Sequence, residues 1–247
     1  MNIGLYQSAA SLSAIERWQD AVSQNITSSQ VPGFKKRTVE FSGVNMGEQQ
    51  FDAKGKIGSG QPSIFPKASY GINFQSGETT PTNRDLDVAL QGEGFLQVAL
   101  PDGTHGYTRA GSLHLRTDRT LVGSNDAPVL SEGGSPMTLL ETGGEIRISA
   151  DGSIMQGTAS IGKLGVFKFA DNAKLTPIGG GVFLSPAGNA PTAVDNPEVL
   201  QGYLEGSNVM PLREMVSLVQ IARAYEANQK VLTSRDQTAQ KALESLG

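Results

Sequence analysis

The C-terminal stretch from Ser207 to Leu246 reads SNVMPLREMVSLVQIARAYEANQKVLTSRDQTAQKALESL and carries the longest regular apolar pattern in the chain. Spaced by sevens, one line comprises Leu218, Tyr225, Leu232, Ala239 and Leu246, and its half-polar neighbour comprises Ile221, Asn228, Arg235 and Ala242. This spacing predicts a helical heptad pattern. Pro211 suits the first turn, and neither Gly nor Pro follows before Gly247. The predicted helix is roughly 52 Å long, which exceeds the diameter of a small domain.

Two further apolar stripes accompany this pattern. One lies on a different side of the same predicted helix and comprises Leu212, Met215, Val219 and Ala222. The other is N-terminal, ends before Pro32, and comprises Leu5, Ser8, Leu12, Ile15, Gln19, Val22 and Ile26. We therefore expect two long terminal helices that bury apolar faces against each other and also pack on other molecules. Their polar interruptions predict a weak pair that becomes ordered on assembly.

Composition narrows the possible classes of protein. The net charge of -4 provides no basic field for nucleic acid. Charged residues make up only 18% of the 247 residues and 30 are Gly, which favours turn-rich β structure. The absence of Cys excludes disulfides and thiolate metal sites. The first ten residues lack the pattern of a Sec signal, and no apolar run is long enough to predict a transmembrane helix.

The middle of the chain contains two segments with different sequence patterns. Residues 37–82 are polar with scattered aromatic residues, which predicts an extended connector that docks on its neighbours; the alternative is a flexible linker. Residues 83–204 contain short apolar runs such as Phe95–Leu100, separated by turn signals such as Asp151-Gly152. This alternation predicts a β-sandwich or partial barrel of about 120 residues.

Possible chemical sites are weak. His105 and His114 could form a hydrolase triad with Asp102 or Asp118, but no G-x-S-x-G motif supports it, and surface histidines are expected instead. The Gly92-Glu93-Gly94 run begins like a dinucleotide-binding motif, but no helix is predicted after it.

Two further polar positions have ordinary structural interpretations. Asp85 and Asp87 lack the spacing of a calcium loop, so they are expected at a strand edge. Arg109 beside Tyr107 could bind an anion, but a stacking contact or an ion pair within the β domain is expected. No catalytic residue, metal or cofactor is therefore predicted.

Five short motifs occur in the order found in the bacterial flagellar rod and hook proteins, and the chain resembles this axial family over nearly its full length. They are Ser23-Gln24-Asn25-Ile26 with Pro32-Gly33-Phe34-Lys35, LDVALQGEGF at 86–95, YTRAG at 107–111, QGYLEGSNV at 201–209 and AYEAN at 224–228. Two positions depart from the family pattern: Ile26-Thr27-Ser28 stands where Leu-Ala-Asn is usual, and Arg84 stands where an uncharged residue is common. Length and residues 204–208 resemble the rod proteins more than the hook proteins.

The resemblance implies an axial subunit of α+β class. Long N- and C-terminal helices would be paired as a coiled-coil-like D0 domain, with an inserted, mainly-β D1 domain and an extended connector. The expected boundaries are 1–34 for the N-terminal helix, 35–82 for the connector, 83–204 for the β-rich domain and 205–247 for the C-terminal helix. The terminal helices would line a central channel, and the β domain would face outward.

The implied function is a structural subunit of the basal-body rod, a hollow drive shaft that transmits torque and passes exported subunits. Expected partners are copies of itself, other rod or axial proteins and the flagellar type III export apparatus, with neither nucleic acid binding nor membrane insertion. Export would occur without a cleaved signal peptide. The alternatives are a hook-type axial protein, an oligomeric β-domain adhesin or binding module, and an enzyme, for which no catalytic set is found.

Two groups of residues carry this prediction. The expected assembly interface comprises Leu5, Leu12, Ile15, Val22, Ile26, Leu212, Met215, Leu218, Ile221, Tyr225, Leu232, Leu243 and Leu246. The connector and family motifs contribute Asn25, Pro32, Gly33, Phe34, Gly92, Gly94, Phe95, Gly206, Ser207 and Asn208.

Overall fold

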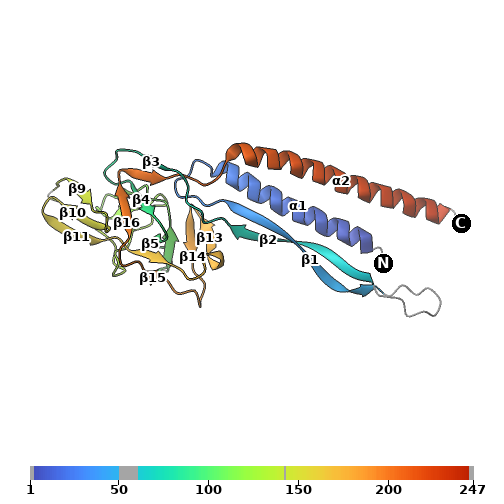
Figure 1. Cartoon of the computed structure of the whole chain (residues 1–247), viewed down its shortest axis with the longest axis horizontal. Helices are drawn as coiled ribbons and strands as arrows, with labels where there is room; N and C mark the ends of the chain where they lie inside the picture. Colours follow the sequence, from blue (N-terminus) through green and yellow to red (C-terminus); the bar gives the residue numbers. More distant parts are fainter. Residues whose placement is uncertain (1–2, 50–60, 142, 245–247) are drawn as a thin grey trace. The chain divides into compact units, whose positions relative to one another are not determined.

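The computed structural model describes residues 3–49, 61–141 and 143–244 (Figure 1). The chain divides into two compact units. The hairpin unit comprises Met1–Thr27, Arg37–Ile72 and Met210–Gly247, and the β unit comprises Ser28–Lys36 and Asn73–Val209. Each unit is therefore built from segments that are far apart in the sequence.

The hairpin unit contains both α-helices of the described residues and its two longest strands. Their bounds are Ile3–Thr27 for α1, Pro211–Glu244 for α2, Arg37–Gln49 for β1 and Gln61–Ile72 for β2. Strands β1 and β2 pair antiparallel, with a register shift between Asn45 and Glu48. Helix α2 begins at Pro211, where a missing backbone N–H costs no helical hydrogen bond.

One face of the β1–β2 hairpin is apolar and packs on α1. Phe41 lies opposite Ala68, and Val39 lies opposite Tyr70, so these four side chains share a face. Trp18 of α1 packs edge-on against Phe41, with ring centroids 5.7 Å apart. Because Ala68 is buried beneath this contact, α1 is held by the hairpin as well as by α2.

The two helices meet in a small apolar cluster. Its buried members are Ile15 and Val22 of α1 and Ile221 of α2. The half-buried residues packed around them are Trp18, Ile26, Leu218 and Ala224. The residues of this cluster lie between positions 15 and 26 of α1 and between positions 218 and 224 of α2.

The predicted fold class is wrong. The described chain is rich in sheet, and its two helices do not form a coiled-coil-like D0 domain of long paired helices. An extended connector was expected to include residues 37–49 and 61–72. These residues instead form a long hairpin that packs against part of the surface of α1. The physical reason lies in the stripes themselves, because polar Gln19, Asn228 and Arg235 interrupt the apolar seam that a coiled coil requires.

The described residues of the β unit form fifteen short strands and one 3₁₀ turn, η1 (Asn172–Lys174). The strands are β3 (Thr79–Pro81), β4 (Val88–Gln91), β5 (Phe95–Ala99), β6 (His105–Thr108), β7 (His114–Leu115), β8 (Leu121–Val122), β9 (Ile146–Ile148), β10 (Ser153–Gln156), β11 (Ala159–Lys163), β12 (Val166–Lys168), β13 (Thr176–Gly179), β14 (Val182–Leu184), β15 (Thr192–Ala193), β16 (Glu198–Gln201) and β17 (Tyr203–Glu205). The largest sheet has the order β13-β14-β6-β5-β12-β15, and a three-stranded sheet has the order β11-β10-β9. Strands β16 and β4, β17 and β3, and β7 and β8 form pairs.

The six-stranded sheet is apolar on both faces. Leu96, Val98 and Val166 point into the main core, which also includes buried Leu113 and Leu121. The opposite face carries an aromatic cluster, since alternate residues of a strand point to opposite sides. Its members are Phe74, Phe95, Tyr107, Phe167, Phe169 and Phe183. Burial on both faces gives the β unit a continuous core of its own.

Candidate assembly interface and its buried junction

The predicted assembly residues fall into an inner group and an outer group. Ile15, Val22 and Ile221 are buried; Leu12, Ile26, Leu218 and Leu232 are half-buried; Tyr225, Met215 and Leu212 are exposed. The side chains of Leu5 and Leu243, and the whole of Leu246, lie outside the described residues. Contacts within the hairpin unit already occupy the inner group, so the outer group is the part that remains available to other molecules.

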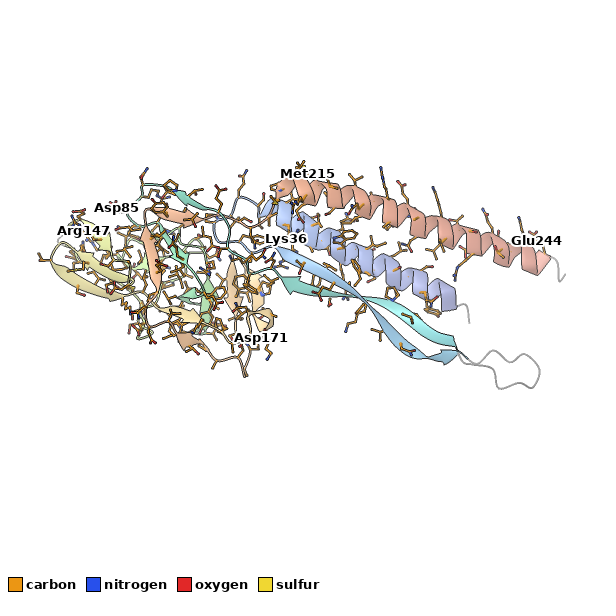
Figure 2. All side chains as sticks on the ribbon, viewed as in Figure 1. Lys36, Asp85, Arg147, Asp171, Met215 and Glu244 are labelled. Atoms are coloured by element: carbon orange, nitrogen blue, oxygen red, sulfur yellow. The ribbon has the colours of Figure 1, made fainter. Side chains whose placement is uncertain are left out.

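An apolar outer stripe runs along the first turns of α2. It consists of Leu212, Met215, Val216 and Val219, whose exposed fractions are 76%, 52%, 54% and 54%. With about 3.6 residues per turn, this spacing places the four side chains on one face of the helix. Ile221, buried against α1, lies on the opposite face, and Figure 2 shows Met215 projecting away from α1. Four adjacent exposed apolar side chains make this stripe a candidate interaction surface.

A buried amide, Asn25, joins three elements of the hairpin unit. Its Nδ2 donates to the carbonyl of Arg37 at 2.8 Å and to Oε2 of Glu214 at 3.0 Å. Its Oδ1 accepts from the N–H of Arg37 at 2.8 Å. The side chain therefore pairs with the first residue of β1 as a neighbouring strand would, and it also holds the start of α2. Glu214 is buried near the N-terminus of α2, where the helix dipole favours a negative charge.

A second buried polar group, the junction cluster of Lys35, Arg109 and Glu205, lies in the β unit. The Lys35 ammonium donates to Oε1 of Glu205 at 2.6 Å and to the carbonyl of Gln75 at 2.9 Å. A guanidinium nitrogen of Arg109 lies 3.5 Å from Oε2 of Glu205. Burial lowers the pKa of Lys35 and of Arg109, and in both residues the Glu205 carboxylate opposes that shift. The cluster is therefore a largely dehydrated set of charges whose anion is shared by two cations.

Arg109 also has neutral partners. Its guanidinium donates to the carbonyls of Leu90 and Gly92 and lies 5.6 Å from the centroid of the Phe95 ring. The expected ion pair and stacking contact of Arg109 are both present, and its ion-pair partner is Glu205.

Asn208, three residues after Glu205, also binds the segments around the junction cluster. Its Oδ1 accepts from the N–H of Lys36 at 2.7 Å. Its Nδ2 donates to the carbonyls of Asn73 and Gln75, both at 2.8 Å. The amide thus joins the same chain segments that contact the junction cluster.

Two glycines allow the backbone to approach closely at this point. Gly33 has φ +69, and a Cβ there would lie 2.4 Å from the carbonyl carbon of Arg109. A Cβ at Gly77 would lie 2.0 Å from the carbonyl oxygen of Gly206. Gly33 also donates its N–H to the carbonyl of Glu205 at 2.7 Å. Any side chain at either glycine would push these segments apart.

The predicted motif residues lie in the β unit, apart from Asn25. Those in or beside the junction are Pro32, Gly33, Phe34, Gly92, Phe95, Gly206, Ser207 and Asn208, while Gly94 packs near Val166. Sequence reasoning did not identify Lys35, Glu205 and Glu214 as site residues, although the first two stand inside the quoted motifs. A charged side chain within an otherwise uncharged motif is the signal that could have singled them out.

The histidines do not form a catalytic arrangement with the aspartates considered above. His105 Nδ1 lies 3.1 Å from the amide nitrogen of Gln97, and the exposed His114 lies 3.8 Å from Asp126. Asp102 accepts from the backbone and hydroxyl of Thr104, and these bonds lower its pKa. Asp118 accepts from the backbone N–H of Thr120, and its pKa is lowered in the same way.

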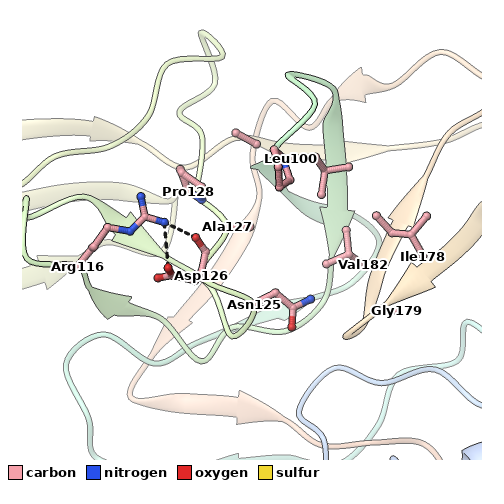
Figure 3. A pocket seen from close by; sticks show the side chains of 11 residues that line it. Leu100, Arg116, Asn125, Asp126, Ala127, Pro128, Ile178, Gly179 and Val182 are labelled. Carbon is pink, nitrogen blue, oxygen red and sulfur yellow. Dashed lines mark hydrogen bonds and ion pairs between the residues drawn. The ribbon is translucent and has the colours of Figure 1, made fainter.

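A cavity of about 530 Å³ opens on the β unit (Figure 3). Its lining is mostly apolar and includes Leu100, Pro128, Ile178 and Val182. The charged groups at its edge, Arg116 and Asp126, pair with each other at 3.3 Å. The Asp126 carboxylate in the cavity lining is therefore part of an ion pair.

Two properties of the described residues concern membranes and metal ions. Within residues 3–49, 61–141 and 143–244, no helix is long and apolar enough to cross a membrane. The same part of the chain contains no cluster of three His, Cys, Asp or Glu side chains that could hold a metal ion.

Family comparisons match both units. Residues 200–245 match the model described as "Flagellar basal body rod FlgEFG protein C-terminal", and residues 89–156 match "Flagellar hook protein FlgE/F/G D1 domain". The chain is 32% identical to flagellar basal-body rod protein FlgF of Caulobacter vibrioides, over 100% of this chain and 99% of the relative.

Two other flagellar basal-body rod proteins are similar to this chain over nearly their full length. FlgF of Rhizobium meliloti is 31% identical over 100% of this chain and 99% of its own. FlgG of Buchnera aphidicola subsp. Acyrthosiphon pisum is 30% identical over 96% of this chain and 97% of its own. The motifs slightly favour the FlgF subtype, whereas relatives of both names match at similar identity. The chain therefore belongs to the family of flagellar basal-body rod proteins of the FlgF and FlgG type.

Proposed function

We infer that this chain is a structural subunit of the flagellar basal-body rod and that it polymerises through its terminal helices. The first part follows from family membership. The second part rests on one observation, the outer stripe of α2, which exposes Leu212, Met215, Val216 and Val219 on the face opposite α1. Neighbouring subunits that cover this stripe would complete the burial of a helix that the free chain packs on only one side.

The magnitude of this burial is sufficient to drive association. Fully burying one Val, Leu or Met side chain contributes about 1.5 to 3 kcal/mol. Four partly exposed side chains would therefore contribute several kcal/mol per subunit. A contact between the stripe and a different surface of the next subunit is heterologous, and repeated heterologous contacts generate helical filaments.

The partners, mechanical role and export route that we propose are those expected for a flagellar rod protein. Partners are copies of this chain and other rod proteins, and the assembled rod transmits torque and passes exported subunits. We further propose delivery by the type III export apparatus without a cleaved signal, no insertion into a membrane, and no enzymatic activity. The division of the chain into residues 1–34, 35–82, 83–204 and 205–247 remains a prediction. Similarity to named rod proteins supports this function over the hook-type and adhesin alternatives.

A matched pair of substitutions tests the outer stripe. Val219→Asp places a charge on the stripe, and Gln220→Asp places the same charge on an adjacent exposed position outside it. We expect Val219→Asp to abolish rod assembly and swimming, while the purified protein unfolds at the wild-type temperature because the site is exposed in the free chain. Gln220→Asp should swim normally. Wild-type swimming and normal rods with Val219→Asp would overturn the proposal that this face carries subunit contacts.

A further inference from the structure

The chain passes between its two units four times, and the β-unit residues at these passages belong to three stretches. Residues 28–36 belong to the β unit although α1 precedes them and β1 follows them. Residue 73 re-enters the β unit after β2, and residue 209 leaves it before α2. Lys35 lies in the first of these stretches, and Gln75 and Glu205 lie within a few residues of the other two.

Glu205 contacts each of these stretches directly. Its carboxylate accepts from Lys35 in the first stretch at 2.6 Å and from the N–H of Gly77 after the second at 3.0 Å. Its own backbone carbonyl accepts from Gly33 at 2.7 Å, and Glu205 itself precedes the third stretch. One residue thus ties together positions that lie 170 and 128 residues apart in the sequence.

We propose that Glu205 is the positioning residue of this junction: with Lys35 it holds the three connecting stretches in one fixed arrangement that rod assembly requires. This inference rests on the proposed function as a rod subunit. It assigns to the buried ion pair a role in geometry, distinct from the contacts that the outer stripe makes with neighbours. A subunit that transmits torque passes force along all its connections, and a common anchor distributes that force among them.

Stability alone does not explain a charged pair at this place. Replacing a buried ion pair by apolar residues of similar volume is often neutral or stabilising, because the pair must be dehydrated. Leucine and methionine could fill the same volume, but neither can accept a hydrogen bond from Gly77 or donate one to Gln75. The charged pair therefore provides what an apolar pair lacks, namely directional bonds to several segments at once.

Two features strengthen the assignment. Arg109 lies 3.5 Å from the second oxygen of Glu205, so the carboxylate is held from a third direction. Asn208 bonds to Lys36, Asn73 and Gln75, which repeats the same connections with a neutral side chain. Both arrangements limit the freedom of the stretches, and both depend on the close backbone approach at Gly33 and Gly77.

The test uses the full-length chain with Lys35→Met, Glu205→Leu and the double variant. Each single variant should unfold at a lower temperature, because it leaves an opposite charge buried without its main partner. The double variant should be more stable than either single variant but less stable than wild type, because Arg109 and the Gly77 amide still lose the Glu205 carboxylate. In the double variant, hydrogen exchange at the Gly77 amide should rise by on the order of tenfold, since the charged hydrogen bond is lost. We expect it to fail in rod assembly and swimming.

Separate outcomes distinguish this inference from the proposed function. A double variant that is stable and swims like wild type would show that the pair only contributes stability and would overturn the positioning role. A double variant that is no more stable than the single variants would also overturn it, because the pair would then be indispensable for folding. The proposed function is judged independently, by the Val219→Asp and Gln220→Asp pair. If the Glu205→Asp variant swims and the Glu205→Leu variant does not, the result would support a requirement for a carboxylate.

Discussion

The β unit and the hairpin unit differ in how completely they bury their apolar side chains. The β unit has a continuous core of fifteen buried residues and a second, aromatic cluster on the other face of its main sheet. Among the described residues, the helices of the hairpin unit share a cluster with three buried members, while the outer stripe of α2 stays exposed. From this difference we predict that the β unit is stable by itself and that the hairpin unit gains stability when neighbouring subunits cover it, as the proposed function requires.

The largest expected effect is in the β-unit core. Leu121→Ala removes a fully buried side chain from the middle of the main cluster. We expect a loss of about 3 to 5 kcal/mol, because a cavity forms where the surrounding strands cannot collapse. Chemical denaturation followed by near-ultraviolet circular dichroism measures this loss. A cost below about 1 kcal/mol would mean that the β unit is loosely packed and that the contrast between the units is false.

A smaller cost is expected at the helix contact. Ile221→Ala removes the only α2 residue that is fully buried in the helix cluster among the described residues. We expect the hairpin unit to lose about 2 to 3 kcal/mol while the unfolding of the β unit is unchanged. Helical circular dichroism at 222 nm, compared with the near-ultraviolet signal, separates the two effects. Simultaneous loss of both signals would show that the units unfold together.

The Asn25 amide gives the next effect. Asn25→Ala removes its bonds to Arg37 and Glu214, and buried polar partners that lose a bond cost about 1 to 3 kcal/mol. The loss should appear in hydrogen exchange at the start of β1 and of α2. Thr27→Ala serves as the matched control, because Thr27 is exposed and its hydroxyl bonds within α1 only. Equal effects of the two variants would contradict the special role of Asn25.

The pH dependence of the junction cluster has a defined sign. Because the pKa of Lys35 is lowered in the folded protein from 10.5, the unfolded chain binds more protons in the interval between the two values. The Lys35 contribution to the free energy of unfolding therefore rises as pH increases towards 10.5 and is lost as pH falls through the folded pKa.

Burial raises the pKa of Tyr107, which acts in the opposite direction above pH 10. The measurement must therefore be the difference in stability between wild type and Lys35→Met at several alkaline pH values, since Tyr107 is common to both. We expect this difference to shift in favour of wild type as pH rises. A difference that is independent of pH, or that moves the other way, would contradict the sign derived from Lys35.

The smallest effect is expected at an exposed position of α2. Asp236→Ala should change the stability by no more than about 0.5 kcal/mol, as substitutions at exposed sites generally do. Thermal unfolding compared with Ile221→Ala checks this contrast along one helix. A large loss at Asp236 would mean that the outer part of α2 has tertiary contacts in the free chain.

The helices and the β-rich middle were predictable because their patterns are local. Heptad spacing identifies apolar residues of α1 and α2, but it does not say which partner covers each stripe. The β1–β2 hairpin was missed because Gly43, Pro66 and Gly71 weaken its strand signal, and pairing such as Arg37 with Ile72 joins residues far apart in sequence. The segment expected to be a connector instead forms a hairpin, and α1 contacts this hairpin as well as α2.

The junction shows a different limit of sequence reasoning. The motifs containing Gly33 and Asn208 were identified, but their physical role depends on Lys35 and Glu205, which are 170 residues apart. Charged residues are rarely buried, so composition alone assigns both to the surface. Only the folded chain shows that they form a pair and that Arg109 is its neighbour.

Hydrogen exchange of the full-length protein, free in solution and in assembled rods, tests the contrast between the units most directly. In the free protein, we expect amides of β5 and β6 to be strongly protected and amides of α2 beyond Ile221 to exchange quickly. In rods, the α2 amides should become as protected as those of β5 and β6, because we expect neighbouring subunits to cover the exposed apolar side chains beyond Ile221, such as Tyr225 and Val231, as well as the outer stripe. Full protection along α2 in the free protein, unchanged on assembly, would contradict the account.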